Sequence, residues 1–140
     1  NVTGVQTCAL PIYSRQRMLV YDAVKASHEH PNAEEVYQVV KQRLPDISLG
    51  TVYRNLNLLE EMGQLRRIHT GIGGDRFDAV ITAHPHLICT RCGGVFDLQC
   101  DIDRETELLR QTFEHAGAQV DEVQIRAWGT CDRCKEEGTL

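Results

Sequence analysis

The sequence lacks long apolar runs and an excess of positive charge, and each absence narrows the class of protein. No apolar stretch in the 140 residues approaches the roughly 18 residues of a membrane helix, which argues against a membrane protein. The net charge of −5 is unfavourable for nucleic-acid binding in general, although docking on DNA needs only a local basic face. Residues 13–88 have no net charge, so the whole negative net charge comes from residues 89–140.

A secretion signal and a set of catalytic residues are also lacking. Residues 1–12 have neither the charged start nor the apolar core of a signal peptide. We interpret them as a translated sequencing adapter and expect the natural chain to begin near Tyr13, which sets Cys8 aside. The expected location is therefore the cytoplasm, where cysteines bind metals more often than they form disulfides. Because no nucleophile, base and substrate pocket can be recognised together, we do not expect an enzyme.

Three short helices are predicted in the first half of the chain, within residues 14–27, 30–45 and 46–65. Asn32 and Glu35 have the spacing of a capping box at the start of the second helix. Ser48 is placed to cap the third helix, and Gly63 to end it. Three helices in about 50 residues, the third beginning with small polar side chains, are typical of a helix-turn-helix.

A hairpin is expected directly after the third helix. Residues 64–80 alternate around the turn sequence GIGGD. A hairpin after a recognition helix is the wing of a winged helix, so we expect a winged-helix DNA-binding domain over residues 13–82. The alternative is a small helical bundle with a hairpin and no DNA function.

The second half, residues 83–140, has a different pattern and is expected to form a separate α+β domain. Strands are predicted at 86–90, 94–98 and 118–128, with a helix at 103–117 that turns Leu108, Leu109 and Phe113 inward. A domain of about 50 residues is marginal on its apolar core alone, so a metal would help to stabilise it.

Two C-x-x-C pairs flank this second domain. Cys89 and Cys92 form one pair, and Cys131 and Cys134 form the other. Two such pairs together supply four thiolates, which favours one tetrahedral structural Zn²⁺ with no open position. Surface thiols and a redox C-x-x-C are the alternatives. Cys100 lies outside the pattern, and we expect it to be a partly buried small side chain.

His84 and His86 lie two residues apart, so in a strand both rings face one side. The cysteines already match one another, which leaves the two histidines for a second metal. Imidazoles need further donors, and carboxylates are suited to that task. The pattern alone selects no particular carboxylate, and a plain surface pair remains the alternative.

Five segments of the sequence are distinctive in combination: "HPNAEEVY", "ISLGTVYRNLNLLEEMG", "RFD", "HPHLICTRCG" and "CDRC". Together they resemble the ferric uptake regulator family of metal-dependent repressors. The resemblance implies an amino-terminal winged helix, a carboxyl-terminal dimerisation domain, structural zinc on the four cysteines and a regulatory Fe²⁺ or Mn²⁺ between the domains. The regulatory ligands that it implies are His30, Asp78, His84, His86 and Asp97.

Within that family, aspartate at both carboxylate positions resembles the peroxide-sensing branch. In that branch, bound Fe(II) reacts with hydrogen peroxide and a ligand histidine is oxidised, here His30 or His84. Ala83 and Pro85 occupy positions where iron-uptake regulators often have extra ligands. An iron- or zinc-uptake regulator of the same family is the alternative.

The resemblance also implies a partner, a palindromic double-stranded DNA operator bound by a homodimer. It places the helix from about Ser48 to Gly63 in the major groove and basic residues of the wing and first helix near phosphates. The helix that family members have before residue 14 is replaced here by the adapter-derived segment. A zinc-ribbon module that binds only protein is the rival from another class. The expected DNA-contacting residues are Ser48, Thr51, Tyr53, Arg54, Arg76 and Arg17, with Arg15 as an alternative to Arg17.

Overall fold

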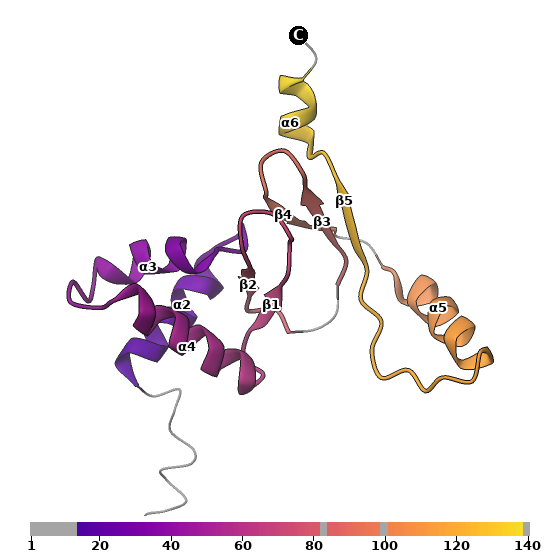
Figure 1. Cartoon of the computed structure of the whole chain (residues 1–140), viewed down its shortest axis with the longest axis horizontal. Helices are drawn as coiled ribbons and strands as arrows, with labels where there is room; N and C mark the ends of the chain where they lie inside the picture. The colour runs from indigo at the N-terminus through magenta and orange to yellow at the C-terminus, as the bar shows by residue number, and fades with distance from the viewer. Residues whose placement is uncertain (1–13, 82–83, 99–100, 139–140) are drawn as a thin grey trace, which may run out of the picture. The chain divides into compact units, whose positions relative to one another are not determined.

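The computed structural model describes residues 14–81, 84–98 and 101–138. The expected adapter-derived segment and Cys100 lie outside these residues. The chain divides into two compact units, one up to Ile81 and one from Thr82 onward. Figure 1 shows the helices and strands of each unit. None of the described helices has the length and apolar character needed to cross a membrane.

The first unit contains three helices that pack on one another in every pairing. They are α2 (Arg15–Ala26), α3 (Ala33–Lys41) and α4 (Leu49–Glu61). Their apolar stripes meet in a core that excludes water, and burial of these side chains is the main force that holds the unit together. The buried apolar residues of this core are Val20, Val24, Ala33, Val36, Val40, Ile47, Val52, Leu56, Leu59, Leu65 and Phe77.

The predicted helix starts are confirmed in α3 and α4. Asn32 Oδ1 accepts from Glu35 N at 2.8 Å, and Glu35 Oε2 accepts from Asn32 N at 3.2 Å, which is the reciprocal capping box. Ser48 Oγ accepts from Thr51 N at 3.1 Å. Gly63 follows α4 with φ of 72°, a left-handed conformation that glycine adopts without a steric penalty. Local side-chain chemistry therefore fixes where both helices begin.

The predicted hairpin is also present. Strands β1 (Arg66–Ile68) and β2 (Arg76–Asp78) pair antiparallel, with Arg67 opposite Phe77. Beyond this pair, Arg76 forms an isolated bridge with Asn32, in the loop before α3. The strand β2 therefore lies between β1 and the loop that joins α2 to α3.

The second unit is built around a three-stranded sheet. Strands β3 (His86–Cys89), β4 (Val95–Asp97) and β5 (Arg126–Gly129) are ordered β4-β3-β5. The strand β3 pairs antiparallel with β4 and parallel with β5. Helix α5 (Asp103–His115) lies in the crossover between β4 and β5, and the short helix α6 (Asp132–Glu137) follows β5. The two units together give the predicted α+β fold, with helices and small sheets.

The prediction that α5 turns its apolar residues inward is wrong. Leu108 and Phe113 are each 55% exposed and Leu109 is 42% exposed, and no residue of Asp103–His115 is buried. The sequence pattern identifies the apolar stripe of this helix correctly, but none of the described elements covers it. The last strand is also shorter than predicted, since residues 118–125 are irregular, and α6 was not predicted.

Candidate metal centres and DNA-binding face

The four cysteines of the two C-x-x-C pairs lie together in the second unit. Cys89 ends β3, Cys131 precedes α6 and Cys134 lies within it. All four Sγ atoms are within 4.8 Å of one another, and Cys92 Sγ is 3.9 Å from Cys131 Sγ. Thiolates bound tetrahedrally at about 2.3 Å from Zn²⁺ lie about 3.8 Å apart. The four thiols are therefore grouped closely enough to serve as the ligands of one tetrahedral ion.

The surroundings of these thiols are unequal. Backbone N–H groups of Cys92 and Cys131 lower the pKa of the Cys89 thiol to about 6, and Cys131 N lies 3.4 Å from Cys89 Sγ. Burial raises the pKa of the Cys134 thiol to about 12. Zinc binds cysteine as the thiolate, so an ion at this cluster displaces the protons that the four thiols still carry. Metal binding at this cluster consequently releases protons.

Two arginines that sequence reasoning missed lie beside the cysteines. Arg91 Nη1 donates to Cys134 O at 2.9 Å, which fastens one C-x-x-C turn to the other. A hydrogen bond to Cys92 raises the pKa of Arg133 above its ordinary value. Each arginine directly precedes the second cysteine of its pair. That repeated C-x-R-C pattern was a signal from which both arginines could have been found.

Three of the five expected regulatory ligands lie together in the second unit. His86 in β3 pairs directly with Asp97 in β4. His86 Nε2 is 3.1 Å from Asp97 Oδ1, and His84 Nε2 is 3.0 Å from the same oxygen. Two ligands at right angles, each about 2.1 Å from an ion, lie about 3 Å apart. The separations therefore match those of donors that share one metal.

The other two expected ligands lie together in the first unit. His30 is in the loop between α2 and α3, and Asp78 ends β2. Both are buried, and His30 Nδ1 is 3.7 Å from Asp78 Oδ2. His30 has φ of 50°, a left-handed conformation that costs a non-glycine residue about 1–3 kcal/mol. A nitrogen and a carboxylate are a suitable but incomplete donor set for a divalent metal.

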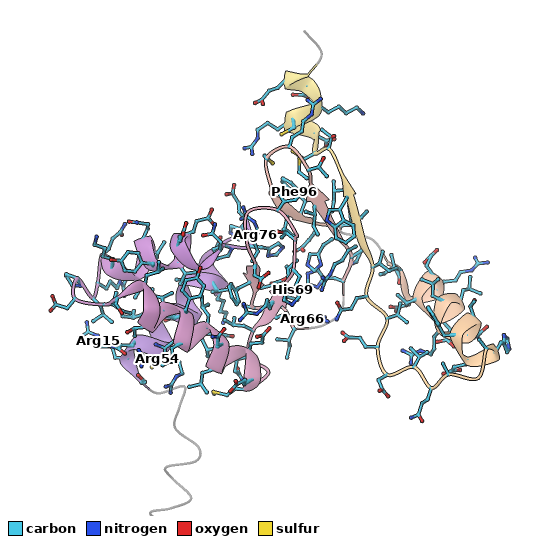
Figure 2. All side chains as sticks on the ribbon, in the orientation of Figure 1. Arg15, Arg54, Arg66, His69, Arg76 and Phe96 are labelled. Carbon is cyan, nitrogen blue, oxygen red and sulfur yellow. The ribbon has the colours of Figure 1, made fainter. Side chains whose placement is uncertain are left out.

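The expected DNA-contacting residues of α4 divide into two kinds. Tyr53 and Arg54 are exposed on the first turns of the helix. By contrast, the hydroxyls of Ser48 and Thr51 lie 2.9 Å apart and take part in the helix cap. Arg54 Nη2 donates to Thr51 Oγ1 at 3.2 Å. The cap therefore organises the start of the helix that carries the exposed Tyr53 and Arg54; Arg54 is labelled in Figure 2.

Two other arginines expected at DNA phosphates donate to groups within the first unit. Arg17 Nε donates to Asn55 Oδ1 at 3.1 Å, and Asn55 in turn donates to Thr51 O, so Arg17 ties α2 to α4. Arg76 Nη1 donates to His30 O at 3.0 Å. Arg15, the alternative, is exposed on α2 (Figure 2).

Arg67 joins the β1–β2 hairpin to α4 and was not predicted from the sequence. Its guanidinium bonds Glu60 of α4 at 3.0 Å and Asp75 of the wing at 3.0 Å, and it lies over the ring of Phe77, 4.8 Å from the centroid. These partners lie 7 to 10 residues away in the sequence, at no regular spacing. No local sequence pattern predicts these contacts of Arg67.

Comparison with known proteins connects this geometry to a family. Residues 12–127 match the model of the ferric uptake regulator family. The chain belongs to the ferric uptake regulator family. Members of this family are metal-responsive transcription regulators and not enzymes, so the expectation that this protein is not an enzyme is confirmed.

Individual members of the ferric uptake regulator family are similar to this chain in sequence or in fold. The peroxide-responsive repressor PerR of Staphylococcus epidermidis is 33% identical over 123 residues, which are 88% of this chain and 81% of the relative. The peroxide stress regulator of Campylobacter jejuni has a TM-score of 0.74 and 31% identity, with 96% and 99% of the two chains covered.

The fold is shared more widely within the family. The ferric uptake regulator of Helicobacter pylori has a TM-score of 0.80 at 23% identity, over 96% of this chain and 93% of that one. Three functional metal-binding sites are described for that protein. At this identity the likeness supports the fold, and the assignment of ions to the cysteine and histidine clusters rests on their own donors.

Proposed function

We propose that this protein is a homodimeric, cytoplasmic transcriptional repressor whose binding to a palindromic DNA operator depends on a regulatory Fe²⁺ or Mn²⁺. One observation carries the proposal. The first unit holds a His30 and Asp78 pair, and the second holds a His84, His86 and Asp97 cluster. Each set is incomplete by itself, and a single ion that takes donors from both would complete them.

An ion shared in this way would act on the orientation of the units. The two reading helices of a dimer must enter the major groove at half-sites of fixed spacing, so only some orientations of the DNA-binding units fit the duplex. An ion that binds best when both donor sets meet at one point favours those orientations. The metal therefore needs no contact with DNA to control affinity.

The chemistry of the donors favours iron or manganese at this site. Three imidazoles and two carboxylates are harder ligands than thiolates and are suited to Fe²⁺ and Mn²⁺, whereas the four-cysteine cluster is suited to structural Zn²⁺. His84 and His86 approach one oxygen of Asp97, and the two rings lie 4.3 Å apart between centroids. The two carboxylates would offset the charge of a divalent ion, and the imidazole nitrogens would add neutral donors.

We further propose that the regulatory site senses hydrogen peroxide. In that reaction the imidazole of His30 or His84 would lose two electrons and gain one oxygen atom, hydrogen peroxide would be reduced to water, and bound Fe(II) would mediate the electron transfer. An oxidised ring is a poorer ligand, so the protein would release the metal and then the operator. Similarity to the peroxide-responsive repressor of Staphylococcus epidermidis and the stress regulator of Campylobacter jejuni supports this assignment.

The deciding experiment loads zinc-replete protein anaerobically with Fe(II) or Mn(II), measures operator binding, adds peroxide and maps the modified peptides by mass spectrometry. With Fe(II), we expect one added oxygen on His30 or His84 and loss of DNA binding; with Mn(II), we expect neither. The exposed His28, two residues before His30, is the internal control and stays unmodified.

Two outcomes separate the parts of the proposal. Metal-dependent DNA binding without histidine oxidation would exclude peroxide sensing and favour an iron- or zinc-uptake regulator. Equal DNA binding with and without the regulatory metal, unchanged by His84→Ala and His86→Ala, would exclude the metal-dependent repressor. His28→Ala is the matched substitution, and it should leave the metal response intact.

A further inference from the structure

The backbone of His30 needs a specific explanation. Among residues 14–81, 84–98 and 101–138, His30 is the one non-glycine residue with a positive φ, at 50°. Pro31 follows it, and a following proline favours extended backbone instead. A conformation of this kind persists only where surrounding groups hold it in place. The groups that hold His30 therefore decide where its imidazole is presented.

The strand β2 supplies those groups. Arg76 Nη1 donates to His30 O at 3.0 Å and lies 3.5 Å from Glu29 O. The next residue, Phe77, donates its backbone N–H to Pro31 O at 3.0 Å. Two consecutive residues of β2 thus hold the carbonyl oxygens of three consecutive loop residues. The main chain on both sides of the His30 Cα atom is fixed by this strand.

The same nitrogen of Arg76 also lies near the start of α3. Its Nη1 is 3.6 Å from Glu35 Oε2, the same oxygen that accepts from Asn32 N in the capping box. Only 15% of the Arg76 side chain is exposed. Figure 2 labels Arg76 in β2, at the level of the loop before α3. Its bonds are made within the first unit, so it is poorly placed to reach a phosphate.

We propose that Arg76 is a positioning residue for the regulatory metal: by holding the His30 carbonyl, it sets the backbone from which the imidazole meets Asp78. Arg76 and Asp78 are alternate residues of β2 and share one face of the strand. On that face, His30 Nδ1 lies 3.7 Å from Asp78 Oδ2. The inference rests on the proposed function, and it replaces the expectation that Arg76 contacts DNA.

The sign of the effect on metal affinity distinguishes this role from simple electrostatics. A guanidinium near a cation site repels the ion, so removal of the charge alone would tighten metal binding. Loss of positioning weakens it, because groups that orient a ligand typically contribute about 10- to 100-fold in metal affinity. A phosphate contact, by contrast, would change DNA affinity and its salt dependence but not metal binding without DNA.

The test measures Mn(II) binding to the zinc-replete full chain without DNA, by electron paramagnetic resonance of free Mn(II). We expect Arg76→Gln to raise the Kd for Mn(II) by about tenfold or more. In a His30→Ala background, the same substitution should change Kd by less than about twofold, because Arg76 acts through His30. Arg43→Gln, the same chemical change at an exposed arginine of this unit, is the matched control and should have no effect.

Unchanged or tighter Mn(II) binding by Arg76→Gln would overturn the inference, as would an equal loss in the His30→Ala background. If Arg76→Gln does not fold, Arg76→Lys takes its place in the same cycle; it keeps the charge but lacks the planar fork. Failure of the unsubstituted protein to bind Mn(II) would instead overturn the proposed function. If the unsubstituted protein responds to the metal and Arg76→Gln binds Mn(II) normally, only the positioning role of Arg76 is excluded.

Discussion

The two units of this protein are stabilised in different ways. In the first, three helices and the wing enclose a core of aliphatic and aromatic side chains. In the described part of the second, the buried apolar residues are Ile88, Val95 and three cysteines, and the cysteines form a cluster of their own. The apolar stripe of α5 is exposed. The first unit thus carries its own stabilising burial, whereas the described part of the second has few buried apolar side chains, four cysteines grouped as an ion would need them and an exposed apolar stripe on α5.

Removal of zinc should have the largest effect on stability, and it should act on the second unit alone. Structural zinc in small domains contributes on the order of 10 kcal/mol to folding, so we expect a chelator, or Cys131→Ala, to unfold the second unit and leave the first intact. Hydrogen exchange read by mass spectrometry would check this. Peptides from β3 and β5 should lose protection while those from α4 keep it. Retained protection in β3 would contradict this prediction, because it would show that the apolar side chains keep the second unit folded without zinc.

A cavity in the first core should have the next largest effect. Leu56 is fully buried in α4, and Leu56→Ala is expected to cost about 2–5 kcal/mol through lost contacts and residual cavity. Denaturant unfolding followed by circular dichroism would measure the loss, and zinc content should not change. The control is Leu58→Ala, at a half-buried position of the same helix, for which a clearly smaller cost is expected. Equal costs would contradict the packing described here.

A charge on the exposed stripe of α5 should weaken self-association without unfolding the helix. We predict that the proposed homodimer covers this exposed stripe. Phe113→Glu would place a carboxylate in that contact and raise the dimer dissociation constant about tenfold, roughly 1.4 kcal/mol, as measured by sedimentation. Gln111→Glu adds the same charge about 200° around the helix and should leave the dimer intact. A dimer insensitive to Phe113→Glu would place the interface elsewhere.

The smallest predicted effect lies in the wing. Burial opposes ionisation of Asp75, but hydrogen bonds from Arg67 and His69 outweigh it and lower the pKa of Asp75 below its ordinary value of 3.8. A carboxylate with a lowered pKa contributes stability above that value and loses it as pH falls through the folded-state pKa. Because Asp75 is about one-third exposed, Asp75→Asn should cost less than about 1 kcal/mol at neutral pH.

That cost should disappear in acid. Unfolding of the first unit at about pH 6 and about pH 2.5 would compare the variant with the unsubstituted protein, and the difference should be present only at the higher pH. A difference that persists at the lower pH would mean that the substitution perturbs packing and not charge.

The features predicted correctly from the sequence depend on short spacings. The capping box of Asn32 and Glu35, the cap at Ser48 and the two C-x-x-C pairs each involve residues within a few positions of one another. Such patterns report local chemistry that holds whatever the rest of the chain does. Most element starts and the cysteine cluster could therefore be predicted.

The features that were missed depend on partners far along the chain. The bonds of Arg76 to His30 and of Arg17 to Asn55 span 46 and 38 residues, and nothing in the local sequence indicates them. The parallel pairing of β5 with β3 is equally nonlocal. For α5, the amphipathic pattern identified the apolar face but could not show whether any other element covers it.

The parallel pairing of β3 with β5 has a consequence for synthesis. The two cysteine pairs that meet beyond those strands are separated by 38 residues in the sequence, from Cys92 to Cys131. A ribosome adds about 5–20 residues per second, so roughly 2–8 seconds pass between translation of the first pair and of the second. During that interval the nascent chain offers only two of the four thiols, so an ion at this cluster could bind all four sulfur atoms only after Cys134 has been translated.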